Sequence, residues 1–123
     1  MSWREPYYVL GSDGRTPVPC DMWTWGAAAE NRRNYERDPW CVGQTKWADG
    51  AALSTVFLGL DHQWGDEGPP ILFETMLFDD DEDDYQTRCS TWDEALVMHR
   101  AGVLWAVENG HGQPISSILV GVL

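Results

Sequence analysis

The chain has 123 residues, of which 20 are Asp or Glu and 8 are Lys or Arg, so its net charge is −12. This length predicts one domain, and a hydrophobic content of 43% predicts that the chain folds around a core. The negative charge disfavours direct binding to nucleic acid or to an anionic membrane, and it favours basic partners. Three cysteines without a CxxC pair argue against a disulfide framework, and no apolar run is long enough to span a membrane.

The N-terminal third is expected to contain a strand, an extended segment and a helix. Tyr7–Leu10 has the pattern of a short strand that a Gly-Ser-Asp-Gly turn closes, and two prolines favour an extended segment over 16–20. Asp21 then has the position of a helix N-cap, and the helix is expected over 21–37, because an Asp-Pro pair follows. Its inner stripe at helical spacing consists of Met22, Trp25, Ala28, Ala29 and Arg32. Trp23 lies off this stripe and is expected to be exposed.

The middle of the chain predicts an antiparallel meander. Residues 53–60 and 71–78 are two apolar runs of strand length, rich in β-branched and aromatic residues, on either side of a Gly/Pro loop. A third strand over 40–47 precedes them, and an Asp-Gly pair in the link favours a hairpin. Three strands with short links predict the centre of a sheet.

An acidic run follows the meander and precedes a second helix. Six adjacent carboxylates are expected to form a solvated loop. A short strand over 85–89 completes the sheet edge. The second helix is expected over 90–108, since Ser90 with Asp93 and Thr91 with Glu94 have the spacing of a capping box, and an Asn-Gly pair ends it. Its inner face consists of Trp92, Leu96, His99, Val103 and Ala106.

These elements predict an α+β fold: an antiparallel sheet of four or five strands, with helices 21–37 and 90–108 packed on one face. The tail over 114–123 is too apolar to remain in water. One possibility is that it pairs with the sheet edge of its own chain, near Tyr7–Leu10 or 85–89. The other is that it pairs across a twofold axis and forms a homodimer.

Four polar residues are candidates for a metal-dependent or acid–base site: Asp61, His62, Glu74 and His99. These residue types suit zinc or manganese, but their spacing matches no metal-binding motif. The alternative is that Glu74 and His99 are hydrogen-bonded structural residues. Cys89 with His99, or Cys41 with His62, would be a nucleophile and its base, but no flanking signature accompanies either pair.

The acidic run is the strongest candidate for a binding surface. In an extended segment, Asp79, Asp81 and Asp83 lie on one side at roughly 6.6 Å intervals, which resembles a row of backbone phosphates. Such a row fits the basic groove of a nucleic-acid-binding protein, where counterion release favours binding. The surface predicted to bind a partner protein consists of Asp79, Asp80, Asp81, Glu82, Asp83, Asp84, Asp66, Glu67 and Trp64. The alternative is a solvated loop without a partner.

Three segments resemble a family of small phage and prophage proteins. They are Ser-Thr-Val-Phe-Leu-Gly-Leu-Asp-His at 54–62, Gly-Pro-Pro-Ile-Leu-Phe-Glu-Thr-Met at 68–76 and Ser-Thr-Trp-Asp-Glu-Ala at 90–95. The resemblance covers most of the chain up to about Met98. The chain departs from the family in the acidic run, where relatives tend to carry a short glycine-containing loop, and in the apolar tail. The resemblance implies a setting rather than a reaction, namely a bacterial cytoplasm during infection or lysogeny.

The setting and the charge together predict a phage-encoded acidic protein that binds and inhibits a host defence complex, with CRISPR–Cas as the first candidate. Its partner would be a basic, nucleic-acid-binding host protein, which the acidic surface would engage as a nucleic-acid mimic. No cofactor, membrane or direct nucleic-acid binding is expected, this function requires no catalysis, and the chain would be a monomer or a homodimer. Two alternatives remain open, a small metal-dependent enzyme using the four polar residues and a virion or assembly accessory protein.

Overall fold

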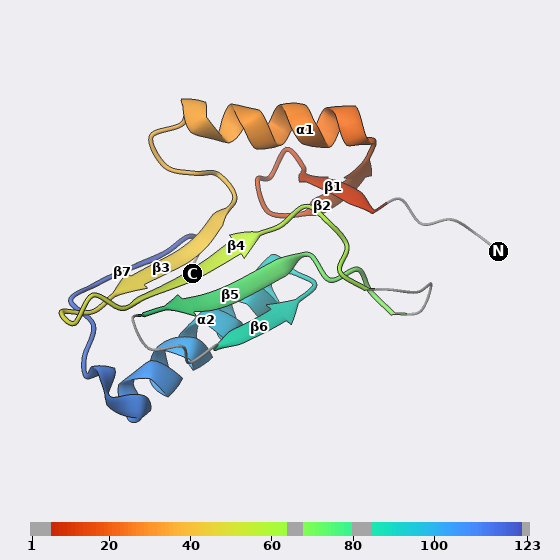
Figure 1. The fold of residues 1–123 in the computed structure, drawn as a ribbon. Helices are drawn as coiled ribbons and strands as arrows, with labels where there is room; N and C mark the ends of the chain where they lie inside the picture. Colours follow the sequence, from red (N-terminus) through yellow and green to blue (C-terminus); the bar gives the residue numbers. More distant parts are fainter. Residues whose placement is uncertain (1–5, 64–67, 80–84, 122–123) are drawn as a thin grey trace.

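The computed structural model describes residues 6–63, 68–79 and 85–121. Within these ranges the chain forms a five-stranded antiparallel sheet, a two-stranded hairpin and two α-helices (Figure 1). The α+β class predicted from the sequence is therefore confirmed.

The N-terminal hairpin and the first helix form one packed unit. β1 (Tyr7–Leu10) pairs antiparallel with β2 (Pro17–Cys20), and α1 (Met22–Asn31) packs on β1. Asp21 caps α1 by accepting a hydrogen bond from the Thr24 N–H at 2.7 Å, as expected.

α1 differs from the expectation in its packing and in two details. It was expected on the same face of the sheet as the second helix, but it packs on β1 of the hairpin, and of the two described helices α2 alone packs on the larger sheet. The helix continues only as a 3₁₀ turn over Arg32–Asn34 rather than to residue 37, because Arg32 binds the Asp38 carboxylate and the chain becomes extended at Tyr35. Met22 was expected on the inner stripe but is 50% exposed, because α1 contacts a narrow hairpin rather than a broad sheet. Trp23 is 80% exposed, as predicted.

The larger sheet has the strand order β6-β5-β4-β3-β7, and all its neighbours are antiparallel. The predicted meander is confirmed. Its three strands are β3 (Cys41–Lys46), β4 (Ala52–Phe57) and β5 (Phe73–Phe78). The edge strand that was expected over 85–89 is β6 (Gln86–Cys89). Gly50 in the β3–β4 turn has φ +93°, a conformation that glycine adopts without steric cost.

The apolar tail forms β7 (Ser116–Leu119), which pairs with β3 of the same chain from Gly43↔Leu119 to Lys46↔Ser116. An intramolecular strand was one of the two predicted possibilities. Its predicted location near β1 or near 85–89 is wrong, because the meander leaves one edge of β3 unpaired. The chain reverses towards that edge through Gly110 and Gly112, which both have positive φ.

α2 (Trp92–Ala106) covers one face of the five-stranded sheet, where it contacts β3, β4, β5 and β6 (Figure 1). Thr91 is the N-cap of α2, as its spacing to Glu94 predicted: its hydroxyl accepts a hydrogen bond from the Glu94 N–H and donates one to the Glu94 carboxylate. After α2 the chain continues over Val107–His111, where Asn109 and Gly110 leave helical geometry.

The core between α2 and the sheet has two apolar clusters with a polar belt between them. The larger cluster contains the aromatic series Trp40, Phe57, Phe73 and Trp92, with successive ring centroids 5.1, 5.3 and 6.1 Å apart. The smaller cluster consists of Trp47, Ala51, Leu53, Leu77 and Ala106. Thr55 lies between Leu53 and Phe57 on β4, and Thr75 lies between Phe73 and Leu77 on β5, so the threonines separate the two clusters.

Candidate functional site

One end of the molecule gathers acidic side chains from three separate segments, and we call it the acidic end. Its acids are Asp49 in the β3–β4 turn, Asp79 after β5 and Glu108 after α2, and His111, also after α2, lies among them. These segments meet at the same end of the sheet in Figure 1. Asp79 is also the first residue of the acidic run, so the acidic end is where that run leaves the sheet.

His111 joins these segments. Its Nδ1 lies 2.6 Å from Asp49 Oδ2, and its Nε2 lies 3.4 Å from Asp79 Oδ2. The Asp79 side chain is only 8% exposed, and its Oδ1 is buried without a hydrogen-bond partner. The pKa of Asp49 is lowered mainly by a hydrogen bond from the Ala51 N–H and, to a smaller extent, by the hydrogen bond with His111. The imidazole therefore fixes the start of the acidic run against the β3–β4 turn.

A long-range contact with Trp47 explains why His111 lies there. The Trp47 side chain is buried at the end of β3, with its ring centroid 6.1 Å from that of His111. Its indole Nε1–H donates to the Gly112 carbonyl at 2.8 Å and holds the segment that carries His111.

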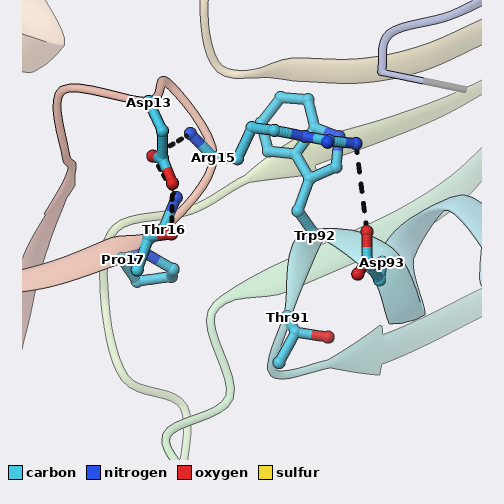
Figure 2. Close-up of a pocket in the computed structure, with 7 residues that line it drawn as sticks. All are labelled: Asp13, Arg15, Thr16, Pro17, Thr91, Trp92 and Asp93. Carbon is cyan, nitrogen blue, oxygen red and sulfur yellow. Dashed lines mark hydrogen bonds and ion pairs between the residues drawn. The ribbon is translucent and has the colours of Figure 1, made fainter. Parts of the chain in front are cut away.

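A shallow pocket of about 300 Å³ lies at the other end of α2 (Figure 2). The β1–β2 turn lines it with Asp13, Arg15, Thr16 and Pro17, and the start of α2 lines it with Thr91, Trp92 and Asp93. The Arg15 guanidinium lies 5.9 Å from the Trp92 ring centroid and 3.9 Å from Asp93. Its Nη2 donates to the Gly121 carbonyl at 2.7 Å.

The groups of this pocket are engaged with one another. Asp13 accepts hydrogen bonds from the side chain of Thr16 and from the backbone N–H groups of Thr16 and Arg15, and these bonds lower its pKa to about 2. Arg15 is shared between Gly121 and Asp93, so it connects the hairpin to α2 and to the chain after β7. The pocket therefore joins three parts of the fold, and Arg15 Nε is buried beside it without a hydrogen-bond partner.

His99 lies in the polar belt of the core with a fully buried side chain. Its Nε2 is 2.8 Å from Thr45 Oγ1 and its Nδ1 is 2.7 Å from Thr55 Oγ1, and Thr55 in turn contacts Thr75 at 2.5 Å. Burial lowers the pKa of His99 to about 4, which favours the neutral ring. With both ring nitrogens bonded to hydroxyls, His99 is a structural residue, as the alternative interpretation held.

The four candidates for a metal or acid–base site do not converge. Glu74 alternates with the inward-facing Thr75 on β5, so it lies on the face of the sheet opposite His99, where it binds Arg88 at 2.8 Å. Asp61 accepts hydrogen bonds from the Gln63 and Ile71 N–H groups and braces its loop. Across residues 6–63, 68–79 and 85–121, no group of three or more His, Cys, Asp or Glu side chains could hold a metal ion.

The cysteine–histidine pairs do not form either. Both nitrogens of His99 are bonded to threonines, and Cys89 Sγ lies 3.6 Å from the Thr91 carbonyl. Burial is the main cause that raises the pKa of Cys89 to about 11, and the nearby Glu94 charge adds to it. Burial is also the main cause that raises the pKa of Cys41. Both thiols are therefore protonated at neutral pH, whereas a nucleophilic cysteine needs the thiolate.

Of the predicted partner-binding residues, Asp79 lies in the described part of the chain, and its carboxylate faces His111. The other members, Asp80, Asp81, Glu82, Asp83, Asp84, Asp66, Glu67 and Trp64, lie outside the described residues. Sequence reasoning placed Asp49 in a hairpin turn but missed its contact with His111. The available signal was a histidine directly after the Asn-Gly pair that ends α2.

Comparison of the chain with models of known protein families, with curated proteins and with solved structures finds no match. Among the residues that the structure describes, neither helix has the length and apolar character that crossing a membrane requires.

Proposed function

We propose that this chain is a non-catalytic binding protein whose acidic end engages a basic, nucleic-acid-binding protein. The observation that carries the proposal is the contact of His111 with Asp49 and Asp79, because it anchors the first residue of the acidic run at a negative end of the fold. Five further acids follow Asp79 directly in the sequence. A run anchored at its first residue loses less conformational entropy on binding than a free chain does.

The states of the titratable groups support binding rather than catalysis. His99 is saturated by threonine hydroxyls, Glu74 is paired with Arg88, and Cys89 is held protonated by its raised pKa. Each of these side chains has a structural partner, so none of them is poised to transfer a proton or attack a substrate.

The resemblance to small phage and prophage proteins supports a host defence complex in the bacterial cytoplasm as the target, with CRISPR–Cas as the first candidate. A complex of this kind holds nucleic acid in a positively charged channel. The acidic run would occupy such a channel by imitating the phosphate charges, and the protein would then inhibit defence by competition. Partner and protein would associate without a cofactor.

The experiment is competition on purified CRISPR effector complexes of several types. A fluorescent target DNA is bound to each complex, and this protein is then titrated in. The proposal expects displacement of the DNA from at least one type and restored plating of a targeted phage in cells that express the protein. If no complex releases DNA and plating is restored for none, the defence target is wrong.

A further inference from the structure

Within residues 6–63, 68–79 and 85–121, β6 is an edge strand whose outer side no other strand covers. The Leu77 N–H donates to the Tyr85 carbonyl, so residues 85, 87 and 89 direct their backbone groups towards β5. By the alternation of an antiparallel ladder, the N–H and C=O groups of Gln86 and Arg88 point away from the sheet. Such an edge is a template for another extended segment.

A hollow of about 550 Å³ lies beside this edge, between β6 and α2, and we call it the β6 groove. Its lining residues are Thr87, Cys89, Asp93, Glu94, Val97 and Met98, with Arg88 at the margin. Val97 is 66% exposed although it is aliphatic, and Thr87 Oγ1 is buried without a hydrogen-bond partner. An apolar floor beside an unpaired edge is the arrangement that proteins use to bind an added strand.

The charges of the β6 groove define the partner. Asp93, with a side chain 91% exposed, and Glu94 contribute two carboxylates from the first turn of α2, and the cation beside them is Arg15, which lies 3.9 Å from Asp93 and also binds the Gly121 carbonyl, so two acids face one guanidinium. The opposing charge of Arg88 is already engaged by Glu74 at 2.8 Å. The groove is therefore negative at the start of α2 and apolar one turn further on, at Val97.

The spacing of these two features matches an extended peptide. Asp93 and Val97 are four residues apart on a helix, which separates them by about 6 Å along its axis. Alternate residues of a strand face the same side and are about 6.6 Å apart. An added strand would thus place a basic side chain opposite Asp93 and, two residues along, an apolar side chain opposite Val97.

The same charges disfavour a second copy of this chain as the occupant. The acidic run 79–84 precedes β6 in the sequence, whereas Asp93 and Glu94 follow it. Antiparallel pairing of two β6 strands would bring the run of one copy towards Asp93 and Glu94 of the other, and like charges would repel.

We propose that the β6 groove binds an extended segment of a partner protein, in which the side chains facing α2 alternate between basic and apolar. The segment pairs with Gln86 and Arg88 and continues the sheet. This inference deepens the proposed function, on which its choice of a basic partner partly rests, and adds a contact separate from the acidic run.

The test uses a labelled synthetic peptide that repeats Lys-Thr-Val-Thr and the full-length protein. Val97→Arg places a cation in the groove, and Leu104→Arg is the matched control, because Leu104 is 63% exposed on the same helix and does not line the groove. We expect the peptide to bind about tenfold or more weakly to Val97→Arg and nearly normally to Leu104→Arg. Equal affinities of the two variants, both folded by circular dichroism, would overturn the proposal.

A second peptide tests strand pairing itself. Proline in place of each threonine removes backbone N–H groups and preserves the charge, so binding should be lost. The original peptide should also slow hydrogen exchange at the Gln86 and Arg88 amides. Undiminished binding of the proline peptide, or unchanged exchange at both amides, would contradict an added strand.

The groove and the acidic run are separated by a third variant, Asp81→Asn with Asp83→Asn. If this variant loses the peptide while Val97→Arg retains it, the groove proposal fails and the acidic run remains the binding surface. If the Asp81/Asp83 variant displaces DNA from the host complex with the same efficiency as the wild type, while binding of the peptide still requires Val97, the proposed function fails and the groove proposal stands.

Discussion

At the scale of single residues, the most informative side chain is His99, because one buried imidazole bridges two strands. Its ring nitrogens meet Thr45 on β3 and Thr55 on β4, and Thr45 also contacts Ser117 on β7 at 2.7 Å. This chain of hydroxyls satisfies polar groups that would otherwise be costly to bury. It also fixes the register of α2 against the sheet between two apolar clusters.

Stability should depend on pH through His99. Its pKa is about 4 in the fold against the usual 6.5, so the unfolded chain binds the proton more readily. The contribution of the neutral His99 ring to the free energy of unfolding is fully present above pH 6.5. It decreases as the pH falls towards 4, by roughly 3 kcal/mol in total. Urea unfolding at several pH values measures this loss. The control is His99→Asn, which should be less stable at pH 7 but lose less between pH 6.5 and 4, and identical slopes for both proteins would contradict the assignment.

Gly43→Ala tests the space around the same ring. An added Cβ would lie 2.7 Å from Leu119 Cδ2 and 3.1 Å from His99 Cγ, so the packing of β7 and α2 would have to shift. We expect a loss of roughly 1–3 kcal/mol in the free energy of unfolding. Gly26→Ala is the control, because nothing lies within 4 Å of the new Cβ inside α1, and it should raise stability by roughly 0.5–1 kcal/mol. Equal effects of the two changes would mean that β3 does not pack closely against His99.

At the scale of elements, local patterns predicted the meander, β6, both helix N-caps and the inner face of α2. These features depend on strand periodicity, an Asp-Gly turn and capping spacings, which neighbouring residues determine. The partners of α1 and of the tail could not be predicted in this way. No residue of α1 is fully buried, and β7 pairs with a strand about 70 residues earlier, so both depend on long-range packing.

The tail should stabilise the fold through β7. Leu119 is half-buried and packs against the larger apolar cluster, whereas Ile115 is 69% exposed. Leu119→Ser should therefore cost roughly 2 kcal/mol or more, and Ile115→Ser should cost little. Deleting 114–123 should lower the melting temperature further, because the pairing with β3 is lost as well. A melting temperature that survives the deletion would show that β7 does not pair with β3.

At the scale of the whole molecule, charge is distributed unevenly. The open face of the sheet carries Glu74 paired with Arg88, and the pocket of Figure 2 neutralises Arg15 with Asp93 and a backbone carbonyl. The acidic end instead combines three carboxylates, those of Asp49, Asp79 and Glu108, with the single imidazole of His111. Sequence reasoning identified the acidic run but not this anchor, because His111 and Asp49 are 62 residues apart and meet only through the sheet.

The central claim, that the acidic run binds a basic partner, is tested most directly by the salt dependence of that binding. Asp81→Asn with Asp83→Asn removes two charges from the run, and Glu30→Gln with Glu36→Gln removes two exposed charges elsewhere. The affinity of each protein for the host complex is measured at several salt concentrations. We predict a weaker affinity and a shallower salt dependence for the first variant only, because its charges lie in the contact. Indistinguishable affinities and salt dependences for the two variants would contradict the account.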